Sequence, residues 1–329
     1  MVPWRETGRW VWQYLPKDGP EADLLTAAPR PGSFWERHRL PPYVSEFRQL
    51  ARRHPHLENY DAIFGWELRA SAAISLLQKI RPANRRAKLV AVGPILKGPL
   101  LKALPLVRWL LKDAARIVCF SRAECETQSR VLNLPRERFV FVPTFWDTNE
   151  QLTCTEGDFI LAVGHSGRDY PTLLEAVRGT GLPLIICARE PTDLGKGEIP
   201  PNVSVRFRTE SDETNALVAG AAFHVIPLQD TEFSAGQSVL LRAMAAGKAV
   251  VVSDTAGICD YAKGNETAVL VPPGDTEALR DALLRLWGDA DTRKRIGKNA
   301  AESVRTEFGA TQFAARMVEI ANELVTNPL

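Results

Sequence analysis

A short turn with glycines and cationic side chains follows the apolar run Phe159–Val163. It contains Gly164, His165, Gly167 and Arg168. Glycines at such a turn let backbone N–H groups approach an anion closely. Arg168 carries a planar fork of donors that suits a diphosphate, and His165 could bond to the same group. An ordinary strand-to-helix turn with a surface arginine and histidine gives the same pattern, so that interpretation stays open.

A second candidate is a helix start ahead of the helical pattern Gly236–Ala246. Its residues are Ser234, Ala235, Gly236, Gln237 and Ser238. Ser234 is of the type that caps a helix, and the free N–H groups and positive dipole of a helix start attract phosphate. Most helices carry such a cap for structural reasons alone, so the alternative is a cap on a core helix.

A third segment, Val271–Thr276, contains two prolines and a glycine. Proline and glycine are turn residues, and Asp275 or Thr276 is expected to begin the next helix. A turn with a purely structural role is the better interpretation of this segment.

Short apolar runs rich in Val and Ile alternate with amphipathic helical patterns in the second half of the chain. Such runs are typical of parallel strands that are buried on both faces and joined by right-handed β-α-β connections. The predicted strands are Phe159–Val163, Leu184–Ala188, Val203–Phe207, Phe223–Pro227, Ala249–Val252 and Ala268–Val271. The predicted helices are Tyr170–Arg178, Gly236–Ala246, Thr276–Trp287, Asp291–Thr306 and Thr311–Val325.

The first half shows the same alternation less clearly. The predicted elements are strands at Ala22–Ala27, Ala62–Phe64, Lys88–Val92, Arg116–Phe120 and Phe139–Val142, and helices at Ser71–Ile80 and Arg122–Leu132. Residues Glu6–Leu15 predict a helix where a doubly wound domain normally opens on a buried strand. Either the opening strand is absent or the chain has lost its start.

We therefore predict an α/β protein with two doubly wound, Rossmann-like domains that face each other across a cleft. A polar stretch between Pro143 and Glu156 marks the boundary between them. The expected division is a short N-terminal domain at residues 1–148 and a second domain at residues 149–310. A C-terminal helix at residues 311–329 is expected to pack back on the N-terminal domain.

In order and spacing, these segments resemble the C-terminal domain of the family-four retaining glycosyltransferases, which have the GT-B architecture. The resemblance extends over roughly Phe159 to Phe308, and more loosely over Tyr60 to Val142. It rests on the stretches Phe159–Gly164, Tyr170–Ala176, Val239–Val252, Gly257–Ile258, Asp260–Tyr261 and Val271–Asp275.

This resemblance implies a hexosyltransferase that moves a sugar from a nucleotide-diphosphate donor, of the UDP or GDP type, to a glycan, lipid or small-molecule acceptor. It implies retention of the anomeric configuration and no metal or other cofactor. The glycine turn and Arg168 would hold the diphosphate, the helix start Ser234–Ser238 would share that task, and Gly257 would lie near the nucleotide. Residues 1–148 would shape the acceptor side and residues 149–310 the donor side.

Two residues depart from the family pattern. The family's two glutamates near the second segment correspond to Ser234 and Arg242 here. The second glutamate accepts hydrogen bonds from ribose hydroxyls, and arginine has no acceptor atom. Glu232 could replace one lost carboxylate and serve catalysis with Arg168, while Arg242 either contacts the donor or faces solvent. The chain could also be a degenerate GT-B protein that binds a sugar nucleotide or a partner without catalysis.

Other function classes are less well supported. The 329 residues carry a net charge of only +2, which argues against nucleic-acid binding. A sugar-nucleotide epimerase would need catalytic carboxylates and histidine in the cleft, which the sequence does not place. No G-x-G-x-x-G of a nicotinamide dehydrogenase follows a strand. The five cysteines lie far apart, and the N-terminus has no apolar signal region, which predicts a cytoplasmic protein.

The segment Leu96–Asp113 predicts either a helix that lies on the inner face of the membrane or a core helix with solvated lysines. If helical, it has a wide apolar face opposite a cationic face. The apolar residues are Leu100, Leu104, Leu106, Val107, Leu110 and Leu111, and the cations are Lys97, Lys102, Arg108 and Lys112, with Arg85, Arg86 and Lys88 just upstream. Pro105 argues against one continuous helix.

Overall fold

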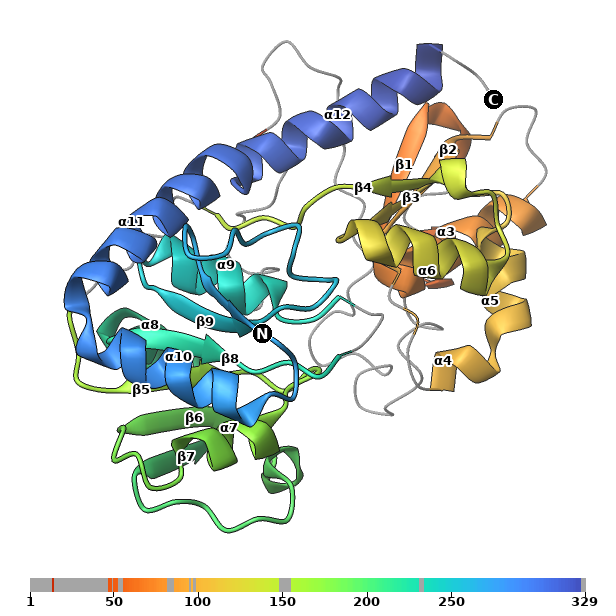
Figure 1. The fold of residues 1–329 in the computed structure, drawn as a ribbon. Coiled ribbons are helices and arrows are strands. Elements are labelled where there is room, and N and C mark those ends of the chain that lie inside the picture. Colours follow the sequence, from red (N-terminus) through yellow and green to blue (C-terminus); the bar gives the residue numbers. More distant parts are fainter. Residues whose placement is uncertain are drawn as a thin grey trace. The chain divides into compact units, whose positions relative to one another are not determined.

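The computed structural model describes residues 14, 47–48, 50–52, 56–81, 86–94, 96, 99–147, 155–230 and 234–326. These residues form two compact units (Figure 1). The N-terminal unit lies within Trp12–Val142 and Ala314–Leu329, and the C-terminal unit lies within Pro143–Phe313. The predicted strand Ala22–Ala27 and the predicted helix Glu6–Leu15, apart from Tyr14, fall outside the described residues.

The N-terminal unit is built on a parallel four-stranded sheet in the order β1-β2-β3-β4. Its strands are β1 (Ala62–Trp66), β2 (Lys88–Val92), β3 (Arg116–Cys119) and β4 (Phe139–Phe141). The helices that alternate with them are α3 (Glu67–Ile80), α4 (Pro99–Lys102), α5 (Leu104–Leu111) and α6 (Arg122–Leu132). Val90, Ala91 and Val92 are at most 1 % exposed, as expected for a strand shielded on both faces.

The segment Leu96–Asp113, in which Pro105 argues against one continuous helix, contains two short helices, α4 and α5, on either side of Ala103. Pro105 lies in the first turn of α5, where a missing N–H costs nothing. The proline therefore begins a helix here instead of interrupting one. Val107 and Leu111 face the core, while Leu106 is 57 % exposed, so the predicted apolar face is divided between core and surface.

The C-terminal unit contains a parallel six-stranded sheet in the order β10-β9-β8-β5-β6-β7. Its strands are β5 (Ile160–Val163), β6 (Leu184–Ala188), β7 (Val203–Phe207), β8 (Phe223–Ile226), β9 (Val250–Ser253) and β10 (Val269–Val271). Its helices are α7 (Tyr170–Val177), α8 (Ser211–Gly220), α9 (Gln237–Ala245), α10 (Thr276–Gly288) and α11 (Ala290–Glu307). Helix α12 (Ala310–Thr326) begins in this unit, and its residues from Ala314 onward belong to the N-terminal unit. The turn predicted at Val271–Thr276 leads into α10, and Asp275 caps that helix by accepting from the N–H of Ala278.

The strand order creates a switch point between β5 and β8. From β5 the chain runs to β6 and β7 on one side, then crosses to β8, β9 and β10 on the other. The loops that leave the carboxyl ends of β5 and β8 therefore diverge, and ligands of doubly wound folds bind in the crevice this creates. The sheet thus places the glycine turn and the start of α9 at the same edge.

The predicted fold class, an α/β protein with two Rossmann-like parallel sheets, is confirmed. The sequence did not predict α8, whose apolar residues are few and whose amphipathic pattern is weak. No helix in the described part of the chain is both long enough and apolar enough to cross a bilayer.

Candidate functional site

Backbone hydrogen bonds join the loop after β5 to the loop after β8. The N–H of Asp169 donates to the carbonyl of Pro227 at 3.0 Å, and the N–H of Gln229 donates to the carbonyl of Gly167 at 2.9 Å. The N–H of Leu228 donates to Ser253 Oγ at the end of β9, at 2.9 Å. Three neighbouring strand ends are therefore held together around the switch point. Ser253 was not predicted as a site residue, because nothing in a strand-terminal serine distinguishes it.

The glycine turn has a backbone that other residues rarely adopt. Gly164 has φ +112° and Gly167 has φ +65°. A Cβ atom at Gly164 would lie 2.5 Å from Nη2 of Arg168, and a Cβ atom at Gly167 would lie 3.0 Å from the Cβ of Ala235. Both glycines are thus required for close approach as well as for their dihedral angles. His165 between them is exposed.

Arg168 is buried within the turn that it follows, with 6 % of its surface exposed. Its Nε donates to the carbonyl of Val163 and its Nη1 to the carbonyl of Ser166, both at 3.0 Å. Burial lowers the pKa of the guanidinium, and the neighbouring Tyr170 opposes that shift. In this structure Arg168 supports the turn through its carbonyl groups. Direct contact between Arg168 and a diphosphate stays a prediction.

The start of α9 differs from the sequence prediction. The helix begins at Gln237, and its N-cap residue is Gly236 with φ +89°, so Ser234 is not the N-cap and no side chain caps the helix. Glycine replaces a capping side chain here because the chain enters the helix through a left-handed conformation. Among the described residues, the first N–H groups of α9 therefore have no side-chain cap, which is the condition for binding an anion from outside. Ser238 lies exposed in this first turn.

The start of α9 contacts the loop after β9. A Cβ atom at Gly257 would lie 3.2 Å from the Cα of Ser234 and 3.1 Å from Nε2 of Gln237. The buried Gln237 donates from Nε2 to the carbonyl of Gly257 at 2.9 Å. The glycine turn, the start of α9 and the loop of Gly257 therefore lie close together: Gly167 lies beside Ala235, and Gly257 lies beside Ser234 and Gln237. The third candidate, Val271–Thr276, leads into α10 instead.

Arg242 lies further along α9 and turns toward α8. Its Nη2 donates to Oδ1 of Asn215, and its side chain is partly buried. The expectation that Arg242 simply faces solvent is wrong, because this hydrogen bond holds the guanidinium against a neighbouring helix. A contact with the donor stays a prediction, and Glu232 lies outside the described residues.

The carboxyl edge of the N-terminal sheet presents aromatic rings and one strained residue. Trp66 ends β1 and Phe120 follows β3, with ring centroids 6.3 Å apart. Glu67, the first residue of α3, has φ +61°, a left-handed conformation that is rare for glutamate. Ser71 Oγ lies 2.7 Å from the carbonyl oxygen of Gly65 and 2.8 Å from that of Glu67, and its one O–H can donate to either, which holds this turn in place.

Part of the C-terminal unit matches a known family. Residues 171–289 match the model described as Glycosyl transferases group 1. A 124-residue stretch is 37% identical to an exopolysaccharide phosphotransferase of Streptomyces coelicolor and covers 37% of this chain and 13% of that protein. A 123-residue stretch is 34% identical to a phosphatidyl-myo-inositol mannosyltransferase of Mycobacterium leprae, and covers 37% of this chain and 33% of that protein.

A third relative is a D-inositol 3-phosphate glycosyltransferase of Corynebacterium glutamicum, 33% identical over 89 residues, which are 27% of this chain and 21% of that protein. The chain therefore spans a third or less of the length of the curated relatives that it matches.

Solved structures resemble the chain over most of its length. Sucrose-phosphate synthase of Thermosynechococcus elongatus has a TM-score of 0.66 at 19% identity, over 95% of this chain and 87% of that one. Anabaena HepE in complex with UDP has a TM-score of 0.67 at 16% identity, over 88% of each chain. At these identities the likeness shows the fold, which is the GT-B fold. Together with the family-model match, it confirms the resemblance to group 1 glycosyltransferases.

Proposed function

We propose that this protein is a glycosyltransferase whose nucleotide-sugar donor binds at the carboxyl edge of the C-terminal sheet. One observation carries the proposal: Gly167, Ala235 and Gly257, from three separate loops, meet at the switch point. The unit in which they meet matches Glycosyl transferases group 1. A structural turn alone would not bring a glycine loop and an uncapped helix start together at the edge where doubly wound folds bind their ligands.

The donor diphosphate would bind backbone groups more than side chains. The turn Gly164–Gly167 and the start of α9 both offer N–H groups, and the helix dipole adds positive potential at the same place. Arg168 would act by holding the carbonyl groups of the turn away from the phosphate. We place UDP ahead of GDP as the donor nucleotide, because HepE, which shares the fold, was crystallised with UDP and UDP-glucose.

The proposed reaction breaks the bond between the anomeric carbon and the diphosphate oxygen and forms a bond from that carbon to an acceptor oxygen on the same face. The departing diphosphate oxygen takes the acceptor's proton. The protein then contributes positioning and stabilisation of the charge that develops on the diphosphate. Retention, metal independence and a catalytic role of Glu232 or Arg168 belong to this proposal. Activity that persists in EDTA would support the metal-free form.

The acceptor would bind on the N-terminal unit. The aromatic rings of Trp66 and Phe120 suit the apolar face of a sugar or cyclitol ring, and Glu67 is an acceptor for its hydroxyls. Inositol phosphates and phosphatidylinositol are the first acceptors to test, because the names of two relatives contain them. The four cysteines within the described residues are free thiols, which suits the cytoplasm as the location of this reaction.

A binding protein without catalysis is the second candidate. The hydrogen bond between Arg242 and Asn215 favours this candidate. Arg242 stands where the family has a ribose-binding glutamate, and this hydrogen bond engages its side chain with a neighbouring helix. Turnover of UDP-glucose or GDP-mannose separates the two candidates. Release of nucleoside diphosphate with any acceptor supports the enzyme, whereas tight nucleotide binding without release supports the binding protein.

Ser238→Asp is the sharpest test of the donor site. A carboxylate in the first turn of α9 favours the helix without ligand, by about 0.5 kcal/mol, but repels a diphosphate at the same N–H groups. We expect the melting temperature without nucleotide to stay equal or rise and the UDP-induced shift to shrink. Wild-type protein at ~100 times the dissociation constant of UDP should gain about 2.7 kcal/mol.

The matched control is Thr276→Asp, which adds the same charge at the start of α10. It should leave the shift by UDP intact. Equal loss of the shift in both variants, or no shift with UDP or GDP in the wild type, would contradict the proposed site.

A further inference from the structure

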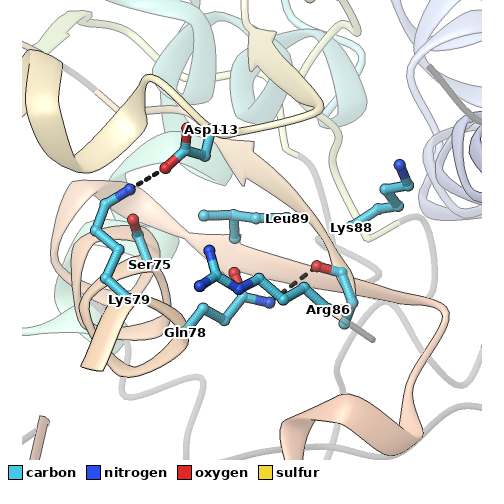
Figure 2. Close-up of a pocket in the computed structure, with 8 residues that line it drawn as sticks. Ser75, Gln78, Lys79, Arg86, Lys88, Leu89 and Asp113 are labelled. Atoms are coloured by element: carbon cyan, nitrogen blue, oxygen red, sulfur yellow. Dashed lines mark hydrogen bonds and ion pairs between the residues drawn. The ribbon is translucent and has the colours of Figure 1, made fainter. Parts of the chain in front are cut away.

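The N-terminal unit has a polar pocket that lies away from the carboxyl edge of its sheet. The pocket has a volume of about 160 Å³ and is lined by Ser75, Gln78, Lys79, Arg86, Ala87, Lys88, Leu89 and Asp113 (Figure 2). Lys88 begins β2 and Lys79 is in the last turn of α3, so the pocket opens at the amino ends of the strands. The proposed donor and acceptor chemistry therefore makes no use of it.

Cationic groups dominate the pocket. Lys79 forms an ion pair with Asp113, and Nε2 of Gln78 donates to the carbonyl of Ala87 at 2.9 Å (Figure 2). No carboxylate among the described residues pairs with Arg86 or Lys88. After the one internal ion pair is subtracted, the Arg86 guanidinium remains in the pocket, whereas the Lys88 side chain points away from it (Figure 2). A guanidinium at a concave polar surface is suited to a phosphate group.

The same corner of the unit exposes large apolar side chains. The exposed fractions are 58% for Ile80, 43% for Leu101, 57% for Leu106 and 43% for Trp109. They lie on the end of α3 and on α4 and α5, and Ser75 Oγ of α3 donates to the carbonyl of Leu110 of α5 at 2.5 Å. The Lys79 ammonium lies 5.1 Å from the centre of the Trp109 ring, so the pocket and the exposed apolar side chains adjoin.

Cations on α4 and α5 extend this surface. Lys102, Arg108 and Lys112 are exposed beside the apolar residues. Apolar and aromatic side chains ringed by lysine and arginine have the composition of a surface that inserts into the head-group region of an anionic bilayer. A soluble anion alone would not explain the exposed Leu106 and Trp109, and an acidic protein would not need the pocket.

We propose that this surface docks on a membrane containing anionic phospholipid, with a lipid phosphate in the pocket beside Arg86. Leu106 and Trp109 enter the interface, and Lys102, Arg108 and Lys112 face the lipid head groups around them. The proposal is independent of the donor site, because none of these residues lies in the C-terminal unit.

Co-sedimentation with vesicles tests the proposal. The vesicles are phosphatidylcholine alone and phosphatidylcholine with about 30 % phosphatidylglycerol, in low and physiological salt. The wild type should bind only the anionic vesicles. Arg86→Gln/Lys102→Gln should weaken that binding roughly fivefold for each cation removed, or about 30-fold for the pair. Leu106→Gln/Trp109→Gln should weaken binding to the anionic vesicles at both salt concentrations.

Lys196→Gln/Lys298→Gln is the matched control, since it removes two exposed lysines from the C-terminal unit and changes the net charge equally. If this control loses as much vesicle binding, overall charge attracts the protein to the membrane, and the proposed phosphate site in the pocket is wrong. No binding of wild type to anionic vesicles would overturn the membrane, even if soluble glycerol phosphate binds in the pocket. An unchanged melting transition of the N-terminal unit shows that the variants in that unit keep their fold, and an unchanged UDP-induced shift shows that every variant keeps its donor site.

Discussion

Two residues of this molecule are held by the tertiary fold in unfavourable states: one has a strained backbone and the other a buried charge. Glu67 adopts φ +61° at the carboxyl edge of the N-terminal sheet, and Arg168 lies buried where a surface side chain was the simple expectation. Neither could be predicted from the sequence, because the direction of an arginine and the dihedral angles of a turn depend on neighbours that come from other strands. The sequence shows the type of each residue, but only the structure shows its environment.

Glu67 should reverse the usual order of helix stability. In a helix, glycine is about 1 kcal/mol less stable than alanine, but at φ +61° alanine keeps the strain and glycine loses it. We expect Glu67→Gly to be more stable than Glu67→Ala by about 1 kcal/mol in urea unfolding. If alanine is the more stable variant, the left-handed conformation is wrong. Reduced transfer in Glu67→Gly, despite greater stability, would support an acceptor-site role for the carboxylate.

His224 should make stability depend on pH. It is buried in β8, its Nε2 bonds to the carbonyl of Val218 at 3.2 Å, and burial lowers its pKa from 6.5 to about 4. Below pH 6.5, His224 therefore binds a proton in the unfolded chain, whereas in the folded chain it stays neutral down to about pH 4. Stability falls as the pH drops through this window, by roughly 3 kcal/mol in total.

Urea unfolding at pH 7.5 and at about pH 5 measures this dependence. His224→Gln keeps a hydrogen-bonding side chain but does not titrate, so it should flatten the slope in this window. A slope that is unchanged in His224→Gln would assign the effect to other groups.

Secondary-structure elements were more predictable than residue environments. Short apolar runs located all six strands of the C-terminal sheet within one or two residues. Five of these strands are largely buried and must be apolar, whereas β7, at the edge of the sheet, is largely exposed. The helix α8 was missed, since few of its residues are apolar. A parallel sheet predicts that the glycine turn, the start of α9 and Gly257 lie at the same edge. The sequence did not predict that α9 lacks a capping side chain.

Gly257 should set the position of the α9 start. A Cβ atom there would lie 3.1–3.2 Å from Gln237 and Ser234, so Gly257→Ala must displace them by a few tenths of an ångström. We expect UDP affinity to fall several-fold with little change in the free energy of unfolding. Isothermal calorimetry measures the affinity. Gly264→Ala is the control, because its added methyl group would meet Leu270 only at an ordinary 3.6 Å. Equal affinities for both variants would contradict the assignment.

At the scale of the whole molecule, each unit has its own hydrophobic core. The core of the N-terminal unit surrounds β2 and β3, and those of the C-terminal unit surround its six-stranded sheet. Units with separate cores can unfold in separate steps, so one melting temperature need not describe the chain.

Differential scanning calorimetry should therefore resolve two transitions, of which UDP raises only one. His224→Gln, which lies in the C-terminal unit, should alter that same transition at about pH 5. A nucleotide that raises both transitions equally would mean that the units unfold together. A nucleotide that raises only the transition unaffected by His224→Gln would place the donor site in the N-terminal unit.

The glycine at the N-cap of α9 also has a practical consequence. Within the part of the chain that the structure describes, no side chain caps the first turn, so its N–H groups are open to partners from the solution when the donor is absent. Sulfate and inorganic phosphate are partners of the right charge and shape. Buffers that contain them should therefore act as competitive inhibitors, and kinetics recorded in phosphate would understate how tightly the protein holds its sugar nucleotide.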